Sequence, residues 1–143
     1  MKRVEDSRPK QNFDTDIAKF TERQMEAVRH LDWDCYVPKR NPVKSLLYGG
    51  ALGGGKSYFL RWVAARLLMT WFFEKGLKNV QVMLACEDYP SLKDRQLSKI
   101  AREFPTWLGR LVNDHSEYGK CFILAPEFGS GVICFRNLDD SSK

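Results

Sequence analysis

One eight-residue segment, Gly50–Ser57, constrains the fold of this 143-residue chain more than any other. It reads Gly-Ala-Leu-Gly-Gly-Gly-Lys-Ser and fits the pattern G-x-x-x-x-G-K-[ST] at every fixed position. Such a loop needs a strand before it and a helix after it, because its amides and the helix N-terminus converge on one anion. Both are predicted here, since Ser45–Tyr48 is a short apolar run and Ser57–Glu74 is apolar around most of its circumference.

Each residue type in this loop has a physical role in holding phosphate. The glycines permit positive φ angles and let successive backbone N–H groups reach the phosphate oxygens. Lys56 supplies a point charge to the β- and γ-phosphates and is the predicted catalytic residue, while the Ser57 hydroxyl is the predicted Mg²⁺ ligand. The alternative is a glycine-rich turn that binds nothing. The predicted ATP-binding residues of the loop are Gly50, Gly53, Gly54, Gly55, Lys56 and Ser57.

The remaining apolar runs predict an α/β fold, with a parallel sheet, helices on both faces and a small antiparallel hairpin. Val80–Ala85 is a second buried strand, joined to the first through the helix by a right-handed crossover. Ser91–Phe104 is a second helix, which Pro105 closes. Two short strands, Cys121–Ala125 and Val132–Phe135, form the predicted hairpin.

The N-terminal part combines a polar stretch with a helix signal. Residues 1–19 are polar and are predicted to be a flexible arm. Thr21 and Gln24 have the spacing of a capping box, in which each side chain bonds the backbone of the other. Apolar residues then recur at helical spacing, at Met25, Val28 and Leu31.

The segment LLYGGALGGGKSYFLRW resembles the ATPase domain of the large terminase subunit of tailed phages, the motor that drives viral DNA into a preformed capsid. Upstream, FTERQMEAV resembles the segment whose glutamine contacts adenine in that family. Downstream, EDYPSLKDRQLSKIAREFPTWLG resembles the helix after the second strand, and GSGVICFRNLDDSSK resembles the strand leading toward the Walker B motif. The resemblance extends over roughly residues 20–143.

This resemblance implies a P-loop NTPase fold and ATP hydrolysis that powers packaging of double-stranded DNA. It further implies the small terminase subunit and the portal as partners, a homo-oligomer when intact, the host cytoplasm as location, and no membrane. Gln24 occupies the position of the adenine-contacting glutamine. Its capping-box role with Thr21 is the alternative, and the sequence leaves both open.

Two departures from the family pattern limit what the resemblance implies. Ala51 and Leu52 are uncharged where many terminases place an arginine, so any arginine finger must come from elsewhere. The segment VICFRNLDD is not a Walker B strand, because Arg136 and Asn137 interrupt the apolar run that a central strand keeps. We therefore expect residues 20–143 to be an incomplete, N-terminal portion of the ATPase domain, inactive in hydrolysis by itself.

Two other functions are compatible with the same loop. One is a helicase or recombination ATPase, which a second motor domain would identify, whereas a nuclease domain would identify a terminase. The other is a regulatory module that binds nucleotide without turnover, which a phosphate-release assay on the intact protein would separate.

Charge supports a polyanionic partner only weakly. The net charge is +5, which is equally compatible with an ordinary basic surface. Arg95, Lys99 and Arg102 fall on one stripe of the second predicted helix, where they could follow DNA phosphates, although a solvated helix face is the favoured interpretation. We expect any DNA binding to be weak and sensitive to salt.

Other polar and sulfur-containing residues are assigned structural roles. Glu87 and Asp88 follow a buried strand and are expected to cap the next helix, with a water- or magnesium-orienting role as the alternative. The four cysteines form no CxxC pair, which predicts free thiols in a reducing compartment. The apolar stretch Tyr58–Phe73 contains Arg61 and Arg66 and is too short to span a bilayer. The tryptophans are expected in the core or in helix packing, and His30 and His115 at the surface.

Overall fold

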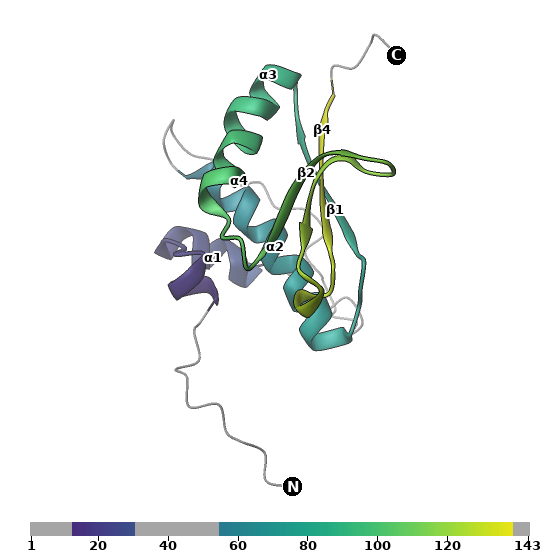
Figure 1. Cartoon of the computed structure of the whole chain (residues 1–143). Coiled ribbons are helices and arrows are strands. Elements are labelled where there is room, and N and C mark those ends of the chain that lie inside the picture. Colours follow the sequence, from purple (N-terminus) through teal and green to yellow (C-terminus); the bar gives the residue numbers. More distant parts are fainter. Residues whose placement is uncertain (1–12, 31–54, 139–143) are drawn as a thin grey trace, which may run out of the picture.

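The computed structural model describes residues 13–30 and 55–138 (Figure 1). Its helical segments are η1 (Phe13–Ile17), α1 (Glu22–His30), α2 (Lys56–Lys75), α3 (Tyr89–Leu92), η2 (Lys93–Leu97), α4 (Ser98–Glu103) and η3 (Pro126–Phe128). Its strands are β1 (Gln81–Cys86), β2 (Gly109–His115), β3 (Gly119–Leu124) and β4 (Val132–Asn137). None of the helices in the described ranges is both long and apolar enough to cross a membrane.

The four strands form one mixed sheet in the order β1-β4-β3-β2. β1 and β4 are parallel, with Gln81 opposite Val132, whereas β3 is antiparallel to both β4 and β2. The predicted hairpin of β3 and β4 is confirmed. The predicted first strand, Ser45–Tyr48, lies outside the described residues. The parallel pair that the structure describes is formed by β1 and β4, a pairing that the sequence did not predict.

β2 is a strand that the sequence analysis missed. It pairs with β3 through Gly109 opposite Leu124 and through Val112 opposite Cys121, with an irregularity before His115. Its residues alternate poorly between apolar and polar, because it is an edge strand and both of its faces are partly exposed.

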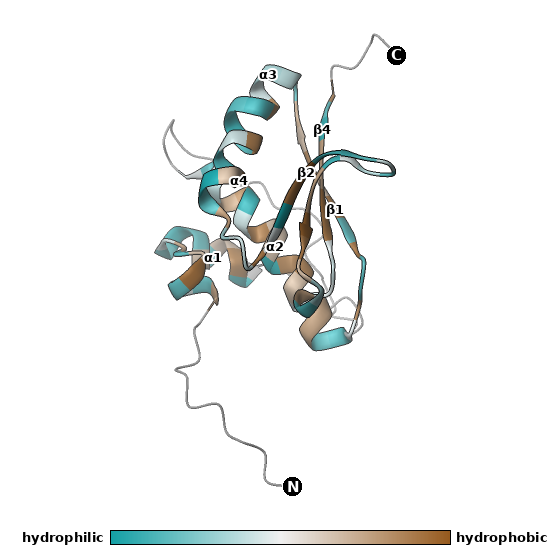
Figure 2. Cartoon of the chain, in the orientation of Figure 1, coloured by the Kyte–Doolittle hydropathy of each residue, from teal (hydrophilic) through white to brown (hydrophobic). Residues whose placement is uncertain are grey.

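The described helices cover one face of the sheet, so the prediction of helices on both faces is wrong for the described part of the chain (Figure 1). Leu84, Ile133 and Phe135 point from the strands into the core with the helices. On the opposite face of β1, Gln81 and Met83 are exposed, Met83 at 64%. The hydrophobic residues accordingly concentrate between α2 and the strands (Figure 2).

A chain of aromatic rings ties the layers together. Phe13 lies against Trp62 of α2, with ring centroids 6.0 Å apart. Trp62 contacts Phe104 edge-on at 4.6 Å, and Phe104 contacts Phe122 of β3 at 4.9 Å. These contacts run from the N-terminal segment through Trp62 of α2 to the sheet. The buried residues of α2 lie on more than one side of the helix, as its apolar circumference predicted; they are Phe59, Arg61, Trp62, Ala64, Ala65 and Leu68.

Residues 13–19 belong to the folded domain, so the prediction of a flexible arm over residues 1–19 is wrong for this part. The turn η1 is closed by a bond from Ala18 N to Phe13 O of 2.8 Å, and Ala18 is fully buried. Asp14 forms an ion pair of 2.6 Å with Arg66 of α2. The arm was predicted from polar composition, whereas Phe13 and Ile17 supply enough apolar surface to dock the segment. Residues 1–12 lie outside the described residues.

Candidate nucleotide-binding site

The structure describes only the end of the predicted phosphate-binding loop. Gly55, Lys56 and Ser57 are described, as is Gln24. Gly50, Gly53 and Gly54 lie outside the described residues, together with Ala51 and Leu52.

Lys56 and Ser57 are the first two residues of the 20-residue helix α2. Phe59 N donates to Gly55 O at 2.9 Å, an α-helical hydrogen bond at the start of α2. In an α-helix the N–H groups of the first turn point along the axis toward the helix N-terminus. The first turn contains no acidic residue, so no side-chain carboxylate there opposes an anion.

Gly55 has the conformation that its position in the motif requires. Its φ of 76° and ψ of 17° are left-handed, a region that residues with a Cβ adopt only with strain. A Cβ built on Gly55 would lie 2.8 Å from Nε2 of Gln24. The backbone angle and the space around it therefore both select glycine.

Gln24 joins α1 to this glycine. Its Oε1 accepts from Thr21 N at 2.9 Å, and Thr21 Oγ1 accepts from Gln24 N at 3.3 Å, so the predicted capping box is confirmed. Its Nε2 donates to Gly55 O at 3.1 Å, and the residue is 2% exposed. Contact with adenine stays a prediction.

Tyr58 fixes the N-terminal segment against the first turn of α2. Its hydroxyl donates to Ala18 O, a contact across 40 positions that local sequence patterns do not reveal. Burial, followed by the nearby Glu103 carboxylate, raises the pKa of Tyr58, while Arg61 opposes the shift. The phenol therefore stays protonated as a donor at neutral pH.

Arg61 is a buried cation that connects α2 to α4 and η2. It is 3% exposed and pairs with both carboxylate oxygens of Glu103, through Nε at 2.9 Å and Nη2 at 2.7 Å. Its Nη1 donates to Arg95 O at 2.7 Å and to Gln96 Oε1 at 3.3 Å. The sequence showed Arg61 only as an interruption of an apolar stretch, because its partners lie 34 to 42 positions away.

Within the acidic pair after β1, the predicted capping role is confirmed for Asp88. Asp88 Oδ1 accepts from Ser91 N at 2.8 Å, and α3 begins at Tyr89. This backbone hydrogen bond is the main cause that lowers the pKa of Asp88. Glu87 is exposed. Within the described residues, no group of three or more His, Cys, Asp or Glu side chains could hold a metal ion, so the water- or magnesium-orienting role stays a prediction.

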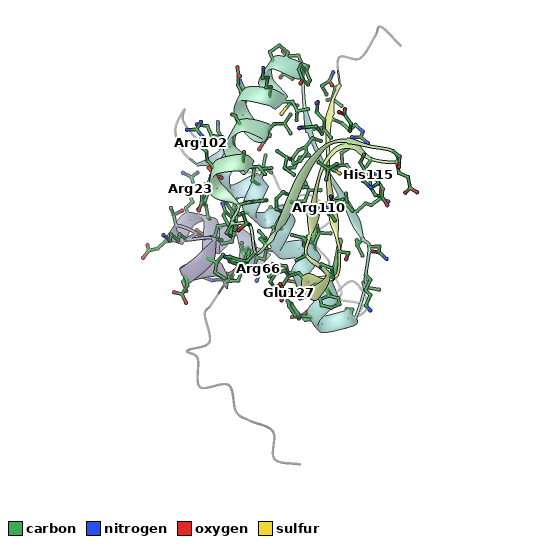
Figure 3. All side chains as sticks on the ribbon, in the orientation of Figure 1. Arg23, Arg66, Arg102, Arg110, His115 and Glu127 are labelled. Atoms are coloured by element: carbon green, nitrogen blue, oxygen red, sulfur yellow. The ribbon has the colours of Figure 1, made fainter. Side chains whose placement is uncertain are left out.

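The basic stripe has the predicted exposure. Arg95, Lys99 and Arg102 are exposed, and Figure 3 shows Arg102 on the side of the molecule away from the sheet. Leu97, Ile100 and Phe104 on the opposite side are buried. This stripe is linked to α2, because Arg61 of α2 donates to the backbone oxygen of Arg95 at 2.7 Å.

The aromatic and histidine predictions have mixed outcomes. Trp62 is 3% exposed, as expected of a core residue, but Trp107 is 46% exposed and rests on Phe128, with ring centroids 5.8 Å apart. Trp107 is therefore outside the core and packs on the short helical segment η3, at the turn of the chain between α4 and β2. His115 Nδ1 accepts from Glu117 N at 3.1 Å and from Tyr118 N at 3.3 Å, a turn-capping role. Trp33 and the side chain of His30 lie outside the described residues.

A groove of about 430 Å³ lies elsewhere on α2. It is formed between η1 and the C-terminal half of α2 and is lined by Phe13, Arg66 and Phe73, among others. Arg66 is ten residues along α2 from Lys56, which corresponds to about 15 Å at the helical rise per residue. This groove is therefore separate from the candidate phosphate site.

Comparisons with known proteins add no relative. No protein-family model, no curated protein and no solved structure matches the chain.

Proposed function

We propose that this chain binds ATP with Mg²⁺ through Gly50–Ser57, and that hydrolysis of this ATP powers packaging of double-stranded DNA in a motor of the large terminase type. One observation supports the nucleotide-binding part: Lys56 and Ser57 of the motif are the first two residues of a 20-residue helix, directly after the left-handed Gly55. The packaging part rests on the resemblance of the segments around this loop.

In the proposed site, each residue acts on a different part of the nucleotide. Lys56 neutralises charge on the β- and γ-phosphates, and the loop amides, including those of Gly55 and Ser57, donate to phosphate oxygens. Ser57 would hold the magnesium ion, which supplies further neutralisation of the phosphates as the bond to the γ-phosphate breaks. No acidic side chain in the first turn of α2 competes with the phosphates for these donors.

The arrangement around Arg61 supports a connection between ATP and DNA. Lys56 and Arg61 lie on the same helix, less than two turns apart. Arg61 in turn bonds Arg95 O and Glu103, the segment that exposes Lys99 and Arg102. We propose this exposed stripe as the surface for DNA phosphates, where binding would be independent of base sequence and sensitive to salt.

The decisive experiment is titration of Lys56→Ala with a fluorescent ATP analogue and Mg²⁺. We expect affinity to fall by about 30- to 150-fold, which corresponds to about 2–3 kcal/mol for losing a charge-assisted contact in a desolvated site. Lys78→Ala is the matched control, because Lys78 is an exposed lysine beyond the far end of α2. Its affinity should remain within about twofold of the parent, on the order expected for a distant exposed charge.

Equal affinities of the parent and Lys56→Ala would refute the nucleotide site. Because residues 20–143 are expected to be inactive in hydrolysis by themselves, phosphate release is measured separately on the intact protein, with and without double-stranded DNA. Nucleotide binding without any DNA-stimulated release would leave the site in place but refute the packaging role.

A further inference from the structure

The pairing of β3 with β4 places two cysteines directly opposite each other. Cys121 is the register partner of Cys134, followed by Phe122 opposite Ile133. Leu124 N donates to Gly131 O at 2.9 Å, which marks Leu124 and Gly131 as a hydrogen-bonded pair. Hydrogen-bonded and non-hydrogen-bonded pairs alternate along an antiparallel ladder, so Cys121 and Cys134, three pairs further on, form a non-hydrogen-bonded pair.

Such a pair has the separation that a disulfide needs. The Cα atoms of a non-hydrogen-bonded pair lie about 4.5 Å apart, within the range of about 4.4–6.8 Å found across disulfide bonds. Both side chains point to the same face of the sheet, because directly opposite residues do so. They pack there with Val132 in a small cluster, on the face opposite the helices.

The environment makes these thiols slow to react. Both are free, with Cys121 fully buried and Cys134 7% exposed. Burial is the main cause that raises the pKa of each thiol, and the neighbouring Cys134 raises that of Cys121 further. Arg136 lowers the pKa of both, and Arg110, on β2 in Figure 3, lowers that of Cys121. Cys134, the more exposed of the two, is the thiol that an oxidant can reach first.

We propose that Cys121 and Cys134 form a dithiol site that a small disulfide, such as oxidised glutathione, converts to a cross-strand disulfide between β3 and β4. The Cys134 thiolate attacks the small disulfide, forms a mixed disulfide and releases one small thiolate. The Cys121 thiolate then attacks the Cys134 sulfur and releases the second. The two protein thiols are oxidised, the small disulfide is reduced to two thiols, and the two protons leave with these products.

This bond would fasten β4 to β3 in the register that they already have. The disulfide would join β3 and β4 around the loop that contains η3. It would leave the pairing of β4 with β1, along the other edge of β4, unchanged. In the predicted reducing compartment both thiols stay reduced, and the disulfide therefore forms only when the surrounding pool of small thiols becomes oxidised. Spacing along the sequence did not reveal the site, because the two cysteines meet only through strand register.

The test is incubation of the whole chain with oxidised glutathione at several pH values, followed by alkylation and peptide mapping. We expect loss of two of the four thiols, a linked peptide that joins Cys121 to Cys134, and faster bridging as pH rises. Cys86→Ser should leave the bridge unchanged. Cys134→Ser should abolish it, and the mapping of the parent protein decides the question even if this variant does not fold.

Three results would overturn the proposal. The first is a bridge from either cysteine to Cys35 or Cys86. The second is a glutathione adduct on Cys134 that persists without transfer to Cys121. The third is no bridge under conditions in which Cys86, a half-buried thiol, has already reacted.

Discussion

Replacement of Gly55 by alanine tests the described geometry at the start of α2. Two costs add at this position. A left-handed alanine costs about 1–2 kcal/mol, partly offset by about 0.4–1 kcal/mol from the reduced entropy of the unfolded chain. The new Cβ would also lie 2.8 Å from Gln24 Nε2, so the Gln24 amide must shift, which weakens or removes its bond to Gly55 O.

The second cost follows from the burial of Gln24. A net hydrogen bond contributes about 0.5–1.5 kcal/mol, and a buried amide left without its acceptor costs about 1–3 kcal/mol. We expect Gly55→Ala to lower the free energy of unfolding by about 2–4 kcal/mol in total. The measurement is urea unfolding followed by tryptophan fluorescence.

Gly76→Ala is the matched control. Gly76 ends α2 with a φ of 67°, close to the 76° of Gly55, and nothing lies within 4 Å of its built Cβ. Gly76→Ala therefore introduces the left-handed backbone cost without a steric clash, and we expect it to lower the free energy of unfolding by about 1 kcal/mol. Equal losses for the two variants would refute the argument, because the contact with Gln24 would then contribute nothing.

Two further predictions concern the ion pairs of α2 and the N-cap of α3. Arg61→Ala should lower the free energy of unfolding by about 3–5 kcal/mol, because it leaves Glu103 and Arg95 O without their buried partner. Arg66 forms a more exposed ion pair, so Arg66→Ala should lower the free energy of unfolding by only about 1 kcal/mol. Both variants are measured by urea unfolding. Asp88→Ala should destabilise the start of α3, and Asp88→Asn should retain the cap. Because the pKa of Asp88 is lowered in the folded state, its contribution is present above the ordinary value of about 3.9 and is lost as pH falls through the folded pKa. Asp88→Asn should therefore reduce the acid dependence of stability; an unchanged pH profile would contradict this assignment.

The elements predicted best from the sequence are those with strong local signals. The bounds of α2 differ by only one residue at each end from the predicted Ser57–Glu74, because Gly55 and Gly76 flank a mostly apolar segment. β1 differs by one residue at each end from the predicted Val80–Ala85. The helix predicted over Ser91–Phe104 corresponds to α3, η2 and α4, and its start at Tyr89 follows from the cap by Asp88.

Features that depend on distant partners were not predictable in this way. β2 is specified by its pairing with β3, which brings Ile123 O within 2.2 Å of where a Cβ on Gly109 would stand. The docking of η1 depends on Arg66, 52 positions from Asp14. In the candidate site, the motif predicted the roles of Lys56 and Ser57, but it contained no information about the contact of Gln24 with Gly55, 31 positions away.

The order of the strands has a consequence for how the chain folds. β2, β3 and β4 follow one another in sequence and pair with their sequence neighbours, so each pairing closes a short loop. β1 instead pairs with β4 from a distance, since Gln81 lies opposite Val132, 51 positions later. Local pairings form faster than distant ones, and we expect the amides of β3 to gain protection in pulsed hydrogen exchange before those of β1. Simultaneous protection would contradict this order. If it holds, β1 joins the sheet last, and the exposed edge of β4 is the part of the folding chain most open to pairing with the wrong strand.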